Sequence, residues 1–350
     1  MVYFLKIMRS VQEIALHACF KERCCMDKAD VDFLVELATR FYVLGQTQAR
    51  IARDLQVDPA TVSRNLKKAR DEGIVHIEIR RPRRLEVTLA RDLADRFGLK
   101  RAVVVANEDG GSAAVASVAA DYLGSALTNG ARLGLSFGRM LSAMVPLLSP
   151  GTVTDLDVSM LLGGFGRAMP GIQGHELARH IASLYPRSRI HYLQAPLLVD
   201  SPDIRQAMLS DGSIRAALQS AAESELALVG IGNLDDSAPL VRYGHLSAED
   251  RKRLLQSGAV GDVSARFFNI RGEPVAVLDD RLIAIEREEL ARIPTVVAVA
   301  AGPEKYAAIR GALRTGYVDV LVTDETTAKE LVQPGAEASR WTGVKGGKAG

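Results

Sequence analysis

Short runs of apolar residues alternate with helix-forming segments through most of this 350-residue chain. Residues 102–106 (Ala-Val-Val-Val-Ala) are apolar throughout, with no polar residue at alternate positions. A strand of this kind has both faces buried, which is typical of a parallel sheet covered by helices. The alternation therefore predicts an α/β domain with a doubly wound, Rossmann-like and mostly parallel sheet.

The predicted elements of this domain follow one another as strand and helix. Strands are expected at residues 102–106, 132–136, 153–162, 190–193, 226–231, 295–301 and 318–322. Helices are expected at 85–98, 113–127 and 175–185, and from residues 138, 204, 249 and 305 onward. Ligands of parallel sheets bind beyond the carboxyl ends of the strands, so a binding site is expected there.

Glycines gather where these strands are expected to end. The clusters are residues 134–139, 162–166, 230–232, 258–262 and 301–305. Glycine lets a ligand approach the backbone closely, and free N–H groups at the start of a following helix attract anions and hydroxyls. Several such loops favour one shared binding rim. Because tight strand-to-helix turns need glycine anyway, simple packing stays the alternative for each single loop.

Three charged residues on this rim are candidates for ligand contact. Asp262 would accept hydrogen bonds from hydroxyl groups, and Arg139 and Lys305 would meet a phosphate or a polyol. An exposed salt bridge is the alternative role for each of them. The full set of expected ligand-binding residues is Gly134, Ser136, Gly138, Arg139, Gly163, Gly164, Asp262, Gly302 and Lys305.

A different pattern precedes the sheet. Apolar residues at helical spacing predict a first helix over 31–42 and a second over 47–55, with Thr47 as N-cap. Asp58-Pro59 is a strong start for a third helix ending near Glu72, because Asp caps free N–H groups and Pro suits the first helical position. Two short helices joined by a tight turn form a helix-turn-helix signature, the mark of a DNA-binding module.

The third helix of this module exposes a polar face suited to a DNA groove. Residues near its amino end can reach base edges, whereas phosphate contacts orient the module without specifying sequence. Base contacts are expected from Ala60, Thr61, Ser63, Arg64 and Asn65, and phosphate contacts from Thr47, Gln48, Lys67 and Lys68. Residues 59–84 hold eight basic and three acidic residues, a local charge of +5, whereas the whole chain carries only +2. A merely solvated charged face is the alternative.

These patterns divide the chain into four parts. We expect a weakly ordered leader over 1–29, the helix-turn-helix domain over 30–84, the effector domain over 85–333 and a disordered tail over 334–350. Residues 74–79 alternate as a short strand and lead into four arginines, which predicts a wing or a linker over the DNA backbone. A start of translation at Met26 is an alternative to Met1.

The cysteine and histidine content excludes several classes of site. Cys19, Cys24 and Cys25 all lie in the leader, which rules out a disulfide framework for the fold and suits a reducing cytoplasm. His175 and His180 are five residues apart, whereas paired zinc ligands on a helix are four apart. No metal, no cofactor and no membrane span is therefore expected.

Taken together, the motifs resemble the SorC family of bacterial sugar-responsive transcriptional regulators from about Asp30 to Gln333. The resemblance rests on GQTQARIA (45–52), DPATVSR (58–64), EGIV (72–75), GLSFGR (134–139), GDVSARFF (261–268), KYAAIRGAL (305–313) and DVLVTDE (319–325). Two positions depart from the family pattern. Met140 stands where the family often has Thr, and Pro303 stands where it often has Gly, which favours a neutral polyol or free sugar over a phosphorylated one.

The resemblance implies a sugar-isomerase-like effector domain, akin to ribose-phosphate isomerases and glucosamine-phosphate deaminases but without their activity. It also implies a homotetramer whose grip on double-stranded operator DNA changes when a sugar, sugar phosphate or polyol binds. The expected function is thus allosteric regulation of a carbohydrate or polyol catabolic operon. Two alternatives stand beside it. One is a sugar-phosphate isomerase or deaminase with an appended DNA-binding head, and the other is a constitutive DNA-binding protein with a structural body.

Overall fold

The computed structural model describes residues 28–75, 83–109, 111–165, 174–243 and 245–333. The chain falls into two compact units, divided between Arg81 and Pro82. We call the first unit the head and the second the body. The expected leader and tail lie outside the described residues, except Lys28 and Ala29, which belong to the first helix of the head.

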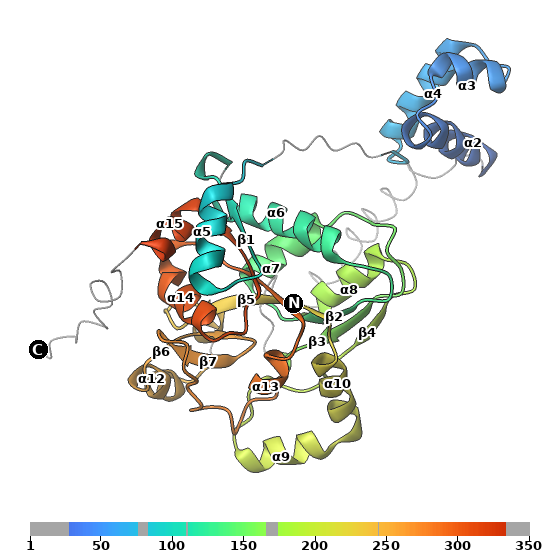
Figure 1. Ribbon diagram of the computed structural model, residues 1–350. Helices are drawn as coiled ribbons and strands as arrows, with labels where there is room; N and C mark the ends of the chain where they lie inside the picture. Colours follow the sequence, from blue (N-terminus) through green and yellow to red (C-terminus); the bar gives the residue numbers. More distant parts are fainter. Residues whose placement is uncertain (1–27, 76–82, 110, 166–173, 244, 334–350) are drawn as a thin grey trace, which may run out of the picture. The chain divides into compact units, whose positions relative to one another are not determined.

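The head consists of short helices packed on a small apolar core (Figure 1). These are α2 (Lys28–Ala38), the π-helical turn η1 (Thr39–Val43), α3 (Gln48–Asp54) and α4 (Pro59–Asp71). The predicted caps are confirmed: Thr47 Oγ1 accepts from Arg50 N at 3.3 Å and Asp58 Oδ1 accepts from Thr61 N at 2.8 Å. The expected wing strand lies outside the described residues, apart from Ile74 and Val75, which form no strand.

The body is built on a central parallel sheet, as predicted. Its parallel strands are β1 (Arg101–Val105), β2 (Arg132–Leu135), β3 (Asp157–Met160), β4 (Arg189–His191), β5 (Leu226–Asn233), β8 (Thr295–Val299) and β9 (Val320–Asp324). They lie in the order β1-β9-β8-β5-β2-β3-β4. Val103 and Val105 face one apolar cluster and Ala102 and Val104 the other, so both faces of the sheet are buried.

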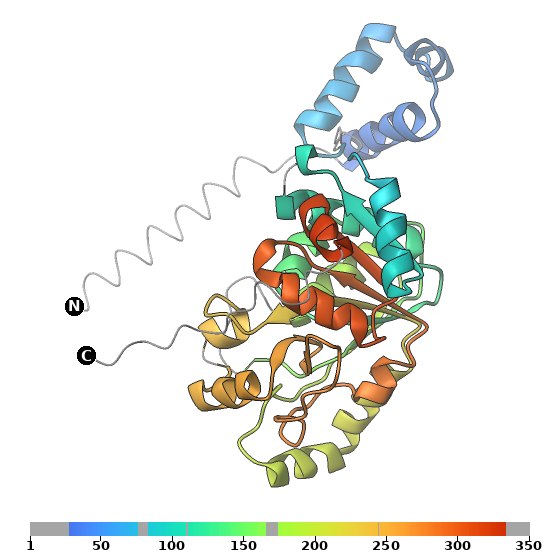
Figure 2. The same cartoon turned by 60° about the vertical axis from the view of Figure 1, so that its left-hand side comes forward.

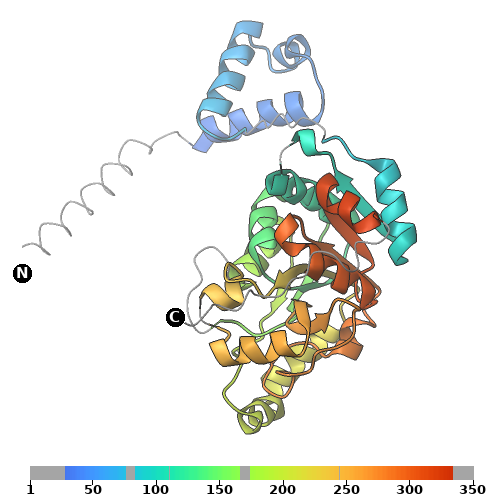
Figure 3. The ribbon, with the colours of Figure 1, turned by 90° about the vertical axis from the view of Figure 1, so that its left-hand side faces the viewer.

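Helices cover both faces of this sheet. The helices are α5 (Val87–Phe97), α6 (Gly111–Ala126), α7 (Arg139–Met144), α8 (Gly174–Leu184), α9 (Pro202–Ser210), α10 (Gly212–Ala222), α11 (Pro239–Arg242), α12 (Ala248–Gln256), α13 (Arg287–Leu290), α14 (Tyr306–Arg314) and α15 (Glu325–Val332). Short 3-10 turns are η2 (Asn107–Asp109), η3 (Val145–Leu147) and η4 (Pro303–Lys305). Helices α6 to α8 pack on one face and α5, α14 and α15 on the other (Figure 3). Helix α9 lies beside α10 at one end of the body (Figures 1 and 2).

One part of the body differs from the sequence-based prediction. Of residues 258–262, expected to form a glycine loop at a strand end, all but Gly258 belong to β6 (Ala259–Val263), which pairs antiparallel with β5 and with β7 (Arg266–Asn269). A Cβ at Gly261 would lie 2.4 Å from the Gly232 carbonyl oxygen and 2.6 Å from Ala308 Cβ. Glycine is present there because β6 runs close to β5 and α14, not because a loop turns.

Candidate functional site

A cavity of about 660 Å³, measured with its open mouth, lies at the carboxyl ends of β2 and β5. These two strands are neighbours in the middle of the sheet. The chain leaves β2 toward β3 and β4 on one side and leaves β5 toward β8 and β9 on the other. Doubly wound sheets leave a crevice where the strand order reverses in this way. We call this cavity the effector pocket.

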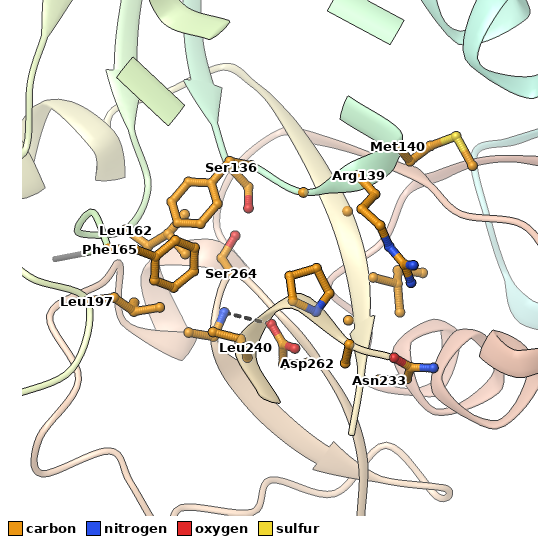
Figure 4. A pocket seen from close by; sticks show the side chains of 18 of the residues that line it. Ser136, Arg139, Met140, Leu162, Phe165, Leu197, Asn233, Leu240, Asp262 and Ser264 are labelled. Carbon is orange, nitrogen blue, oxygen red and sulfur yellow. Dashed lines mark hydrogen bonds between the residues drawn. The ribbon is translucent and has the colours of Figure 1, made fainter. Parts of the chain in front are cut away.

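One side of the effector pocket is apolar. Phe137 and Phe165 meet edge to face with ring centroids 4.7 Å apart, and Phe165 stacks on His245 at 4.2 Å. Leu162, Leu197 and Leu240 extend this wall (Figure 4). Such a wall packs against the C–H groups of a ligand and excludes water around its polar groups.

The opposite side holds a buried carboxyl. Asp262 on β6 is 8% exposed, and its Oδ2 accepts from the backbone N–H of Ala265 at 3.0 Å. Its Oδ1 has no hydrogen-bond partner among the residues that the structure describes. Burial raises the pKa of Asp262 to about 6, although the Ala265 N–H and the charge of Lys305 act in the opposite direction. A buried carboxylate oxygen without a partner is a strong acceptor for a ligand hydroxyl.

Two cations stand near this carboxyl. Lys305 is half-buried, and its Nζ donates to the Ile231 carbonyl oxygen at 2.8 Å. Burial lowers the pKa of Lys305, the nearby charge of Arg139 lowers it further, and Asp262 and Glu304 oppose that shift. Arg139 itself is exposed at the mouth of the pocket. Among the described residues, neither Lys305 nor Arg139 forms a salt bridge with Asp262. Both cations can therefore attract an anionic or polyhydroxyl ligand.

The structure brings together five of the nine residues expected to bind the ligand. Ser136, Gly138, Arg139, Asp262 and Lys305 line the effector pocket. Gly164 lines a smaller adjoining cavity.

The other three expected residues, Gly134, Gly163 and Gly302, lie outside the lining of the effector pocket. Close packing requires glycine at two of these positions. A Cβ at Gly134 would lie 2.7 Å from a Leu161 methyl carbon, and one at Gly163 would lie 2.6 Å from the Ala195 carbonyl oxygen. Gly302 has φ +108°, a conformation that side chains rarely adopt. Close packing therefore explains the glycines at 134 and 163, and backbone conformation explains the glycine at 302, while their contact with a ligand stays a prediction.

Several lining residues escaped the sequence-based prediction. The apolar wall comes from Phe137, Leu162, Phe165, Leu197 and Leu240, which share no spacing in the sequence. Phe137 follows β2, Leu162 and Phe165 follow β3, Leu197 follows β4, and Leu240 lies in α11. The two phenylalanines do carry a signal, because each follows glycines within a predicted strand-end loop. Ser264 has no such sequence signal, since nothing in the sequence predicts the hairpin that brings it into the pocket beside Asp262.

Helix α4 of the head presents the side chains expected to contact DNA. Val62, Leu66 and Ala69 are buried and fix the helix to the head. Of the nine predicted DNA-contact residues, Thr47, Ala60, Ser63, Arg64, Lys67 and Lys68 are exposed, and Gln48, Thr61 and Asn65 are partly buried.

Hydrogen bonds within α4 hold part of this face in place. Thr61 Oγ1 donates to Asp58 Oδ2 at 2.5 Å and accepts from Arg64 Nη2 at 3.1 Å. Asn65 Nδ2 donates to the Thr61 carbonyl oxygen at 3.0 Å. The amino end of α4 therefore carries a pre-ordered polar face.

Among the residues that the structure describes, no cluster of three or more His, Cys, Asp or Glu side chains is placed to hold a metal ion. Within the same residues, no helix is both long and apolar enough to span a membrane.

The chain is similar to transcriptional regulators over most of its length. A protein-family model described as "Putative sugar-binding domain" matches residues 83–333. The chain is 28% identical over 312 residues to the "Deoxyribonucleoside regulator" of Bacillus subtilis (strain 168), covering 88% of this chain and 99% of that protein. It is 30% identical over 309 residues to the "Transcriptional regulator LsrR" of Enterobacter sp. (strain 638), covering 86% and 93%.

A solved structure extends the similarity to three dimensions. The full-length sorbitol operon regulator SorC from Klebsiella pneumoniae aligns with a TM-score of 0.65 at 29% sequence identity. The alignment covers 87% of this chain and 100% of that one, so it includes the head as well as the body.

Proposed function

The chain belongs to the SorC family of sugar-binding transcriptional regulators, and we propose that it regulates an operon for sugar or polyol catabolism. In this proposal the head binds operator DNA through α4, and the effector pocket of the body binds the small molecule that changes the affinity for DNA. The names of its relatives refer to a deoxyribonucleoside and to the sorbitol operon, both of which point to polyhydroxyl compounds as effectors.

The observation that carries the effector part of the proposal is the state of Asp262. Its carboxyl is buried at the reversal point of the sheet, lines a cavity with an apolar wall, and has one oxygen without a hydrogen-bond partner among the described residues. Leaving such an oxygen without a partner is unfavourable by about 1–3 kcal/mol, and a ligand hydroxyl would supply the missing hydrogen bond. A sugar or polyol offers hydroxyls for this oxygen and C–H groups for Phe137 and Phe165.

The DNA part of the proposal rests on the exposed face of α4. Ser63 and Arg64 lie in its first half, where a recognition helix meets base edges, and Lys67 and Lys68 follow, where they would meet phosphates. We further propose a homotetramer, as the family resemblance implies, because heads arranged in symmetric pairs read repeated half-sites. Analytical ultracentrifugation of the full chain tests that assembly.

A thermal-shift screen tests the effector assignment. Purified full-length protein is heated with sorbitol, erythritol, D-ribose, 2-deoxy-D-ribose and their phosphates, because a ligand that binds only the folded state raises Tm by mass action. At least one of these compounds should raise the Tm of the wild type and leave that of Asp262→Asn unchanged. If no compound raised the Tm of the wild type, the effector part of the proposal would be wrong.

A turnover assay on the same samples distinguishes a regulator from an enzyme. The regulator proposal predicts that each phosphosugar is recovered unchanged after incubation with the protein. Isomerisation of a phosphosugar, or release of ammonia from an added amino-sugar phosphate, that disappears in Asp262→Asn or Lys305→Ala would instead establish the enzyme.

A further inference from the structure

The turn that follows Asp262 has an unusual backbone. Val263 pairs with Arg266 at the end of the β6–β7 hairpin, so Ser264 and Ala265 are the two central residues of the turn. Both have positive φ, 50° for Ser264 and 62° for Ala265. Hairpin turns with this conformation usually contain Asn-Gly or a similar pair, because a Cβ is strained in the left-handed region. A turn made of Ser and Ala is therefore kept in place by its surroundings.

Neighbouring residues hold this turn firmly. Arg266, directly after it, is fully buried, and its guanidinium donates to the carbonyl oxygens of Ile285 at 2.7 Å and Ala284 at 2.9 Å. The same side chain forms an ion pair with Glu286 at 2.9 Å. On the other side, a Cβ at Gly232 would lie 2.0 Å from Asp262 Oδ1, so only glycine fits opposite this carboxyl.

The strained turn places a second unpaired oxygen in the effector pocket. Ser264 is 2% exposed and lines the same pocket as Asp262, and its Oγ has no hydrogen-bond partner among the described residues. Figure 4 shows its hydroxyl directed toward that of Ser136, above the Asp262 carboxylate. Two residues of one hairpin thus line the same cavity, and each has a buried oxygen without a hydrogen-bond partner among the described residues, a bond that a ligand could supply.

We propose that Ser264 is an effector-binding residue that acts together with Asp262 to select ligands carrying two hydroxyl groups. One ligand hydroxyl donates to Asp262 Oδ1, and the other forms a hydrogen bond with Ser264 Oγ. The class of ligand is a polyol or sugar whose C–H groups face Phe137 and Phe165. This inference rests on the proposed function, and it adds a specificity residue and a two-point requirement that the family resemblance does not supply.

Two substitutions at Ser264 separate the effect of its hydroxyl on binding from the effect of its strained backbone. Ser264→Ala removes the hydroxyl and keeps the Cβ, whereas Ser264→Gly removes both and relieves the left-handed strain. Isothermal titration with the tightest binder among sorbitol, erythritol and D-ribose should show about 5- to 10-fold weaker binding for both variants. Without ligand, Ser264→Gly should raise Tm by about 2–4 °C relative to Ser264→Ala.

A matched control comes from Ser224. It is also 2% exposed with an unpartnered Oγ, but it lies outside the lining of the effector pocket. Ser224→Ala should therefore bind the polyol within twofold of the wild type. Monodeoxy analogues of the same ligand complete a double-mutant cycle, in which the analogue lacking the partner hydroxyl should lose no further affinity in Ser264→Ala.

The outcomes separate this inference from the proposed function. If the wild type binds a polyol, Asp262→Asn abolishes that binding and Ser264→Ala binds within twofold of the wild type, the role of Ser264 is refuted and the proposed function stands. If the wild type binds none of the compounds, the proposed function fails and the inference fails with it. If only Ser264→Gly weakens binding, the turn conformation matters and the hydroxyl does not, which also overturns the inference.

Discussion

The polar groups on α4 and those in the effector pocket are held in opposite ways. On α4 the side chains of Ser63, Arg64 and Lys67 are exposed to solvent. In the pocket Asp262 and Ser264 are buried, and each has an oxygen without a hydrogen-bond partner among the described residues. Exposed cations suit a partner that carries charge on its outside, whereas buried oxygens suit a molecule small enough to enter and satisfy them.

This contrast teaches how one chain can recognise two chemically different partners. Contacts made by exposed cations are screened by salt and replace counterions around the DNA. Hydrogen bonds in a buried, preformed pocket are little affected by salt but depend on the protonation of the groups that form them.

Salt should separate the two kinds of binding most strongly. With Lys67 and Lys68 of each α4 at phosphates and two heads on one site, raising salt from 50 to 200 mM should weaken operator binding about a hundredfold. Binding of a neutral polyol should change by less than about twofold over the same range. Fluorescence anisotropy with labelled duplex and calorimetry with polyol measure the two affinities. Equal salt dependence of both would remove the distinction.

Substitution on α4 should affect discrimination between DNA sequences. Arg64→Ala should reduce the preference for the specific site over random DNA by about 10- to 100-fold, because a side chain directed at base edges contributes about 1–3 kcal/mol. Arg70 is an exposed arginine near the carboxyl end of the same helix and serves as the matched control. Arg70→Ala should weaken specific and random binding alike. Unchanged discrimination in Arg64→Ala would mean that α4 does not read bases.

Acidic pH should weaken polyol binding. The pKa of Asp262 is about 6, so the carboxylate is mostly protonated at pH 5 and mostly ionised at pH 7. Since the ionised form accepts the ligand hydroxyl, affinity should rise up to about tenfold from pH 5 to pH 7. Asp262→Asn should show no measurable polyol binding at either pH, as expected if this carboxyl accepts the ligand hydroxyl. Tighter binding at pH 5 than at pH 7 would show that the protonated carboxyl donates to the ligand instead.

The Asp262 carboxyl should also make the unfolding free energy of the ligand-free protein depend on pH. Its pKa is raised above the ordinary value of 3.8, so the folded protein binds a proton that the unfolded chain has released. Stability from this group is therefore fully present below about pH 4 and is lost as pH rises toward 6. The loss amounts to about 3 kcal/mol. The difference in unfolding free energy between wild type and Asp262→Asn, followed by denaturant melts from pH 4 to 7, isolates it. A difference that did not vary with pH would contradict the burial of this carboxyl.

The smallest effect is expected in the turn before α4. Gln56 has φ 55°, a left-handed conformation that is strained for a residue with a Cβ. Gln56→Gly should stabilise the head by about 0.5–1 kcal/mol, visible as slower hydrogen exchange of α3 and α4 in the full chain. Gln56→Ala keeps the Cβ and should show no gain. Equal exchange rates in the two variants would mean that the turn is not strained.

Local sequence patterns were enough to predict the head and the central sheet. Asp58-Pro59 fixes the start of α4, because the cap and the proline act on the next few residues only. Residues 102–106 predict a buried strand because their own composition leaves no polar face. The reversal of strand order then locates the pocket at strand ends, where Ser136 and Arg139 were expected.

Features that depend on long-range pairing could not be predicted in this way. Gly232 and Asp262 are thirty residues apart and face each other only because β5 and β6 pair antiparallel. The turn at Ser264 and Ala265 lacks the Asn or Gly that normally marks a hairpin, so the local sequence does not predict a hairpin there. Glycines that line the pocket and glycines that allow close packing likewise look alike in the sequence, because only the folded chain brings their neighbours together.

The most direct test of the account is the affinity for operator DNA with and without effector. Full-length protein is titrated onto a duplex selected from random DNA, in buffer alone and in saturating concentrations of the polyol found by thermal shift. The Kd of the wild type should change at least about fivefold, whereas the Kd of Asp262→Asn should not change. A wild-type Kd that stayed the same while the pocket was saturated would contradict it.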